Sequence, residues 1–277
     1  MKRTVIFILL TLLALSASAS VEKKGDMGLS LSFDNYSDNF LTESANNITG
    51  SFSFNLRINY KPAEIFMLEN NLLSELGCSV FEDDSSGEWL EPVKSSDNID
   101  MESIGRFMPG WFADPYASLR LKTYFTDNTD SVTMYLNPLT ISQGIGIGRY
   151  IVNNEKTQIS LRTGLSAVEH FTRQQYVADS MRFTTEAGFE AVGDISSVLA
   201  ENVNYTGRIR LFKALIKSTS VNENWRSPDL EFENILTASI NEYINVNVNV
   251  KLLYDRDKDA DLMHSENLSI NINYSLF

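Results

Sequence analysis

Residues 244–254 read INVNVNVKLLY, and apolar and polar side chains alternate along the stretch. The even positions from Ile244 to Tyr254 are apolar, whereas the odd positions from Asn245 to Lys251 carry three asparagines and a lysine. Successive side chains of a β-strand point to opposite faces, so this pattern predicts a strand with one apolar and one polar face. A face lined by asparagine suits a watery interior better than a dry core.

The same alternation recurs over most of the chain. Residues 52–60 place Phe52, Phe54 and other apolar side chains at even positions and Asn55 and Arg57 at odd positions. Counting every such segment predicts twelve strands. They lie near residues 26–36, 49–60, 65–78, 97–107, 114–125, 139–151, 157–169, 181–192, 198–213, 228–240, 244–254 and 266–276.

The connections between these strands alternate in length. Long polar connections are expected at 37–48, 79–96, 126–138, 170–180, 214–227 and 255–265, and short ones at 61–64, 108–113, 152–156, 193–197 and 241–243. Long outer loops and tight periplasmic turns are typical of outer-membrane β-barrels. The pattern therefore predicts an all-β, transmembrane, antiparallel up-and-down barrel with both termini on the periplasmic side.

The first nineteen residues have the three parts of a secretory signal peptide. Lys2 and Arg3 precede an apolar run from Val5 to Leu15, and Ala17-Ser18-Ala19 form a cleavage site. Cleavage would leave residues 20–277 as one barrel domain. That domain has no run of apolar residues long enough for a membrane-spanning helix, so a membrane location requires a closed barrel.

Composition excludes several classes of function. The chain carries a formal charge of −13, or about −15 once Lys2 and Arg3 are removed, which makes nucleic acid an unfavourable partner. Two histidines and the single Cys78 are too few for a dedicated transition-metal site, and no cofactor is expected. Cys78 is expected to be a small buried or lipid-facing side chain.

The chain ends in the aromatic residue Phe277. Exported barrels commonly end in such a residue, which the barrel-assembly machinery reads. The expected partners are therefore outer-membrane lipid and this machinery, whereas the sequence does not name a solute.

Several fragments resemble an uncharacterised, domain-of-unknown-function family of Gram-negative outer-membrane barrels. These are FMLENNLLSELG at 66–77, PYASLRLKTYF at 115–125, LNPLTISQGIGIGRY at 136–150, ISLRTGLS at 159–166, YINVNVNVKLLYD at 243–255 and the terminal YSLF. The resemblance implies a location and a fold, and it supplies no catalytic or ligand-binding residues.

Charged residues recur on the polar faces of the predicted strands. The lumen-facing candidates are Arg57, Arg120, Lys122, Arg162, Glu186, Glu190, Arg208, Arg210, Glu231 and Glu233. Further inward charges are expected at Glu69, Glu75, Glu102, Arg106, Arg182 and Lys251. Two interpretations stay open, namely a salt-bridged interior and a charged solute-selective channel. The Arg208 and Arg210 pair predicts attraction of an anionic solute.

Three other motifs are candidate sites. His170 beside Glu169 and His264 beside Ser265 match no hydrolase motif. The acidic loop from Asp255 to Asp261 resembles a calcium loop, but Ala260 replaces its turn glycine. No helix follows the glycines at 144, 146 and 148, which are expected to bend a strand or to make room inside the barrel.

Three functions remain at this point. The leading one is an outer-membrane barrel that acts as a narrow pore or as a structural or surface protein, with no catalytic residues. The second is a membrane-embedded lipid hydrolase. The third is a soluble periplasmic barrel that binds a lipid, which would require apolar residues inside and polar residues outside.

Overall fold

The computed structural model describes residues 20–36, 47–81, 88–127, 133–174, 180–218, 224–256 and 261–276. The signal peptide at 1–19, the acidic run at 82–84 and Phe277 lie outside the described residues. Four residues of the calcium-like loop, 257–260, also lie outside them.

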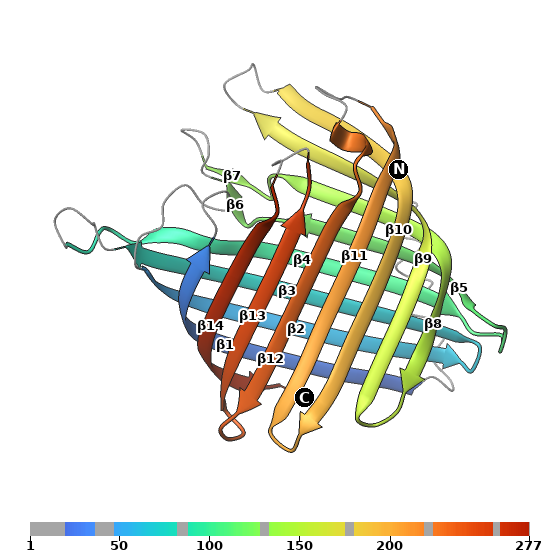
Figure 1. The fold of residues 1–277 in the computed structure, drawn as a ribbon, viewed down its shortest axis with the longest axis horizontal. Helices are drawn as coiled ribbons and strands as arrows, with labels where there is room; N and C mark the ends of the chain where they lie inside the picture. The colour runs from blue at the N-terminus through green and yellow to red at the C-terminus, as the bar shows by residue number, and fades with distance from the viewer. Residues whose placement is uncertain are drawn as a thin grey trace.

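The described strands form one closed antiparallel barrel, in which each strand pairs with its two neighbours and the first pairs with the last. In Figure 1 the orange and red strands of the C-terminal half cross in front of the blue and cyan strands of the N-terminal half. The barrel strands are β1 (Ser20–Tyr36), β2 (Asn47–Ala63), β3 (Phe66–Phe81), β4 (Val93–Phe107), β5 (Asp114–Thr123), β8 (Leu139–Asn153), β9 (Thr157–Gln174), β10 (Ser180–Ala200), β11 (Val203–Lys217), β12 (Asp229–Ser239), β13 (Ile244–Tyr254) and β14 (Met263–Ser275).

All twelve strands predicted from the alternation are present, and most extend beyond their predicted ends. The short turns, such as 154–156 and 240–243, lie at one end of the barrel. Ser20 and Ser275 lie at this end too, because Ser20 pairs with Lys61 beside the β2–β3 turn and Ser275 pairs with Asp26. The even strand number is therefore confirmed. The predicted long connection at 170–180 is wrong, because the ladder between β9 and β10 continues to the pair of Gln174 with Ser180 and leaves only residues 175–179 between the two strands.

One predicted turn is wrong. Residues 193–197 were expected to connect two strands, but β10 continues through them to Ala200 and the turn falls at 201–202. Gly193, Asp194 and two serines have turn-like composition, yet Asp194 forms an ion pair with Arg208 and Ser197 shares a hydrogen bond with Thr157. Contacts to both neighbouring strands thus keep this segment extended.

Two small elements stand on the long-loop side of the barrel. A two-residue ladder joins β6 (Thr126–Asp127) to β7 (Met134–Tyr135), within a connection expected to be irregular. A short 3-10 helix, η1 (Asn224–Arg226), precedes β12. No helix among the described residues is long and apolar enough to cross a membrane.

The two faces of the strands differ sharply. Large apolar side chains such as Ile145 at 63% and Ile272 at 57% are exposed on the outside. The alternate positions hold polar groups, including Arg162 at 4% and Ser269 at 5% exposure. This polarity is the reverse of what a soluble lipid-binding barrel requires.

The glycines of β8 lie on the inner face. Gly144, Gly146 and Gly148 pair in register with Ser166, Gly164 and Arg162 of β9. An added Cβ at Gly148 would lie 3.1 Å from Arg162 Cβ and 3.3 Å from Arg106 Nη1. Gly148 therefore leaves room for arginine side chains inside the barrel, whereas a Cβ at Gly146 would lie 2.1 Å from the Thr163 carbonyl oxygen of the β9 backbone.

Candidate functional site

An ion-pair cluster centred on Glu102 of β4 crosses the barrel interior. Its Oε1 accepts a hydrogen bond from Arg162 Nη2 at 2.6 Å, and its Oε2 accepts one from Arg208 Nη2 at 2.8 Å. Arg162 stands on β9 and Arg208 on β11, whereas the neighbours of β4 are β3 and β5. Side chains from strands that are not neighbours meet only through the lumen, so these three residues bridge it.

A second crossing lies at Glu69 of β3. Tyr150 of β8 donates its hydroxyl hydrogen to Glu69 Oε1 at 2.5 Å, and Arg106 Nε lies 3.2 Å from Glu69 Oε2. The Arg106 guanidinium also lies over the Tyr150 ring, 4.8 Å from its centroid. Strands β4 and β5 separate β3 from β8 around the wall, so this contact is another bridge.

A third bridge joins Lys122 of β5 to Glu231 of β12, whose charged atoms lie 3.7 Å apart. Glu231 also faces Lys251 of β13 at 3.8 Å, and Lys122 faces Asp100 at 3.8 Å. Arg120 donates two hydrogen bonds to Asp100, at 2.8 and 2.6 Å, in a bidentate pair. The positive and negative groups therefore form a chain of contacts from β4 to β13.

Other ion pairs join neighbouring strands along the wall. Lys217 lies 2.7 Å from Glu186, Arg210 Nε lies 2.5 Å from Glu190, and Arg208 Nε lies 2.9 Å from Asp194. Arg208 and Arg210, the pair expected to attract an anion, are thus both engaged by carboxylates of the chain. The concentrated basic charge is compensated locally.

The structure brings eight of the ten sequence candidates into these ion pairs. Arg57 instead donates to the Asn71 amide oxygen at 3.0 Å. Glu233 pairs in register with Arg208 and Lys251 on the same strand face. Asp100 and Asp194 were missing from the expected inward charges, although Asp100 has the same sequence parity as Glu102.

On one side of the ion-pair network, buried side chains fill the lumen. Tyr116 of β5 and Val192 of β10 are 7% and 2% exposed, and an apolar cluster joins Val168, Phe212 and Ala214. Trp225 of η1 packs against that cluster from the long-loop side. Strands β5, β8, β9 and β10 therefore enclose a packed part of the lumen.

The opposite part of the wall has a different character. On β13 and β14 the inward positions carry asparagine and serine, in register pairs such as Asn247 with Ser269 and Asn245 with Asn271. On β1 and β2 the matching positions are serine and glycine, as in the pairs of Ser30 with Ser51 and Gly28 with Ser53. The lumen thus has a charged, packed side and a mainly neutral side with short side chains, on which Arg57 of β2 is a lumen-facing charge.

The geometry adds little support to the candidate catalytic and metal-binding motifs. The His170 Nδ1 atom shares a hydrogen bond of 3.0 Å with the Thr140 hydroxyl, on the inner face of the barrel. Within the described parts of the chain, no group of three or more His, Cys, Asp or Glu side chains is placed to hold a metal ion.

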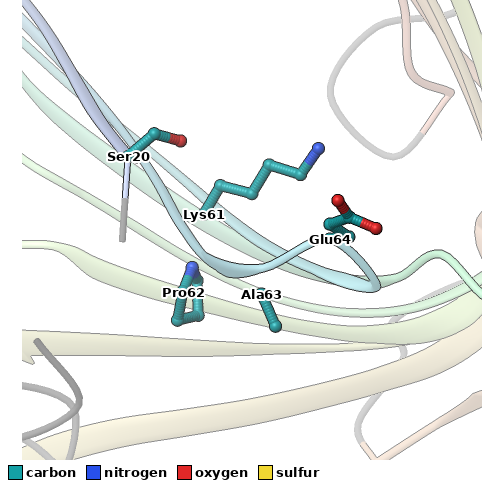
Figure 2. Close-up of a pocket in the computed structure, with 5 residues that line it drawn as sticks. All are labelled: Ser20, Lys61, Pro62, Ala63 and Glu64. Atoms are coloured by element: carbon teal, nitrogen blue, oxygen red, sulfur yellow. The ribbon is translucent and has the colours of Figure 1, made fainter. Parts of the chain in front are cut away.

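A cavity of about 400 Å³ lies at the short-turn rim, where the β2–β3 turn meets the start of β1 (Figure 2). It is lined by Ser20, Lys61, Pro62, Ala63 and Glu64. These lining residues include no histidine or cysteine and no paired carboxylates.

A closed antiparallel barrel with an apolar exterior and an ionised interior belongs to the class of transmembrane β-barrels. No family model and no curated protein matches the chain, so the resemblance to an uncharacterised family stays a prediction.

The chain is similar to solved outer-membrane barrels. The translocator domain of the autotransporter NalP from Neisseria meningitidis is 10% identical, with a TM-score of 0.43 over 99% of this chain and 95% of that chain. An outer membrane channel from Pseudomonas putida F1 is 10% identical, with a TM-score of 0.49 over 94% and 98%. A NanC porin is 8% identical, with a TM-score of 0.44 over 88% and 98%. At this distance the fold assignment rests on the strand pairing of the chain itself.

Proposed function

We propose that this chain is a bacterial outer-membrane barrel that forms a narrow pore for small polar solutes. Export through a cleaved signal peptide at 1–19 is part of the proposal. The observation that carries it is the set of ion pairs between strands on opposite sides of the lumen, centred on Glu102. Such pairs reduce the free cross-section without removing the polar lining that a solute path needs.

The exterior supports the membrane location. Apolar side chains cover the outer positions of the strands, and an unpaired charge there costs about 2 to 4 kcal/mol near the midplane. On the short turn between β4 and β5, Trp111 and Phe112 are 64% and 85% exposed. Aromatic side chains at the end of an apolar band suit the membrane–water interface.

Planar-bilayer recording tests the pore. The wild-type protein is expected to show a small conductance, and Glu102→Gln to raise it and shift selectivity toward anions, because Arg162 and Arg208 lose their shared carboxylate. Glu186→Gln is the matched control, since the Glu186–Lys217 pair joins neighbouring strands and does not cross the lumen. Electrical silence of both wild type and Glu102→Gln would contradict a pore and favour a purely structural barrel.

Cysteine labelling tests the orientation in a Cys78→Ser background. A cysteine at Asp261, on the long-loop side, should react with an impermeant maleimide on whole cells. One at Asn154, in a short turn, should react only after the cells are opened. The reverse pattern would invert the barrel in the membrane.

A further inference from the structure

The neutral side of the lumen contains a regular row of amides. Asn245, Asn247 and Asn249 occupy successive inward positions of β13, opposite Asn271, Ser269 and Asn267 of β14. Two residues along a strand span about 6.8 Å, so the row presents one amide group about every 6.8 Å along the lumen.

These amides have unused hydrogen-bonding capacity. The Oδ1 atoms of Asn245, Asn247 and Asn249 have no hydrogen-bond partner among the residues that the structure describes. On the facing strand Asn271 is 8% exposed and donates from Nδ2 to Ser269 Oγ at 3.2 Å. These oxygen atoms are buried, so a ligand in the lumen reaches the two donors and the acceptor of each amide only after the side chain rotates.

The ion-pair bridges separate this row from the side of the lumen that carries the charged and apolar side chains. The bridges run from β4 to β9 and β11 and from β5 to β12, which cuts off β5, β8, β9 and β10 on one side. Arginine, tyrosine and apolar side chains fill that side. On the other side the inward positions of β13, β14, β1 and β2 carry mainly Asn, Ser and Gly, which extend less far from the wall.

The chemistry of this wall selects against ions. A carboxylate or ammonium that leaves water beside the amides of β13 and β14 finds no opposite charge in that row, whereas hydroxyl groups exchange their water hydrogen bonds for amide hydrogen bonds. The lumen-facing Arg57 lies on β2 and not in the row. The candidate for an anionic solute, Arg208 and Arg210, is already engaged by Glu102, Asp194 and Glu190.

We propose that solutes cross the pore along the asparagine row of β13 and that this row binds an uncharged, hydroxyl-rich solute of the monosaccharide class. This inference rests on the proposed pore function and names its substrate class. The residues assigned to binding are Asn245, Asn247 and Asn249.

The test measures how strongly D-glucose blocks the ion current in planar bilayers. D-gluconate serves as an anionic probe of similar size. Glucose is expected to reduce the wild-type current at lower concentration than gluconate does. Asn247→Ala should weaken the glucose block by about threefold to tenfold, the range for one or two lost hydrogen bonds, without reducing the ion conductance.

A bulky side chain introduced on β13 tests the proposed path of the solute through the barrel. Asn247→Trp should reduce both the ion current and glucose-driven swelling of vesicles several-fold, because the indole projects from the inner face of β13 into the lumen. Val248→Trp is the matched control, since this neighbouring side chain is 42% exposed on the outer face. It should leave both unchanged.

The outcomes separate this inference from the pore itself. A conducting protein that glucose does not block, or that gluconate blocks more strongly, would overturn the neutral-solute assignment and leave the pore intact. Conduction that Asn247→Trp does not reduce would overturn the route. Silence of every variant, including Glu102→Gln, would overturn both proposals.

Discussion

On one side of the lumen Glu102 lies between Arg162 and Arg208; on the other side Asn247 lies between Asn245 and Asn249. The first arrangement buries charges and stabilises them through opposite charges and one charge-assisted hydrogen bond from each arginine to a different carboxylate oxygen of Glu102. The second uses uncharged groups that tolerate incomplete pairing. Single substitutions are therefore expected to cost most at the centre of the charged side and less on the neutral side.

Removing the central carboxylate should have the largest effect on stability. Glu102→Ala leaves Arg162, whose side chain is 5% exposed, without its partner, and should cost about 3 to 5 kcal/mol. Asn249→Ala on the neutral side should cost about 1 kcal/mol or less, because its Oδ1 has no partner among the described residues. Urea unfolding in lipid vesicles measures both. Similar costs for the two changes would show that the two sides do not differ.

A single strand allows the interior to be compared with the exterior. Val248→Arg should destabilise the barrel by about 2 to 4 kcal/mol, provided that the residue lies near the bilayer midplane. Asn247→Arg should cost much less, since a charge in a wet lumen keeps most of its hydration. Refolding titrations of both variants give the difference. A larger cost at Asn247 would mean that the faces are reversed.

Gly146 and Gly50 allow the packed inner face of the barrel to be compared with its outer face. A Cβ at Gly146 would lie 2.1 Å from the Thr163 carbonyl oxygen, so Gly146→Ala requires a backbone shift and should cost about 1 to 3 kcal/mol. A Cβ at Gly50 would meet nothing within 4 Å, and Gly50→Ala should be neutral or stabilising by up to about 1 kcal/mol. The same unfolding assay ranks the two, and an equal loss at Gly50 would refute the steric argument.

The smallest effect is expected at the edge of the network. Lys122 is 36% exposed, and its two carboxylate contacts are long, at 3.7 and 3.8 Å. Lys122→Met should therefore change stability by less than about 1 kcal/mol, because Glu231 keeps Lys251 as a partner. A loss comparable to that of Glu102→Ala would show that the network acts as one cooperative unit.

The strands were predictable because apolar and polar residues alternate with a period of two along the sequence. Alternation predicted the strand number, the inward face and the sorting of short turns. It failed at residues 193–197, where Gly193 and Asp194 have turn composition but ladder contacts keep the chain extended. The composition of this segment gives no information about its pairing with β9 and β11, which keeps the segment extended.

The partners of the inward charges were not predictable. Alternation gives the face of a side chain but not its height in the barrel, and the height depends on strand tilt and register. The meeting of Glu102 with Arg208, which is 106 residues away, therefore appears only in the structure. The neutral side had a visible signal, since Asn and Ser dominate the inward positions of 244–254 and 266–276.

The seam between β1 and β14 sets the order of assembly. These strands pair over eleven register positions, from Asp26 with Ser275 to Tyr36 with Ser265. An incomplete chain that lacked β14 would leave the hydrogen-bonding edges of β1 and β13 open, and open edges cannot remain unpaired within hydrocarbon. Closure is consequently a late event in biogenesis, and ring completion distinguishes a full-length product from a truncated one that proteases can remove.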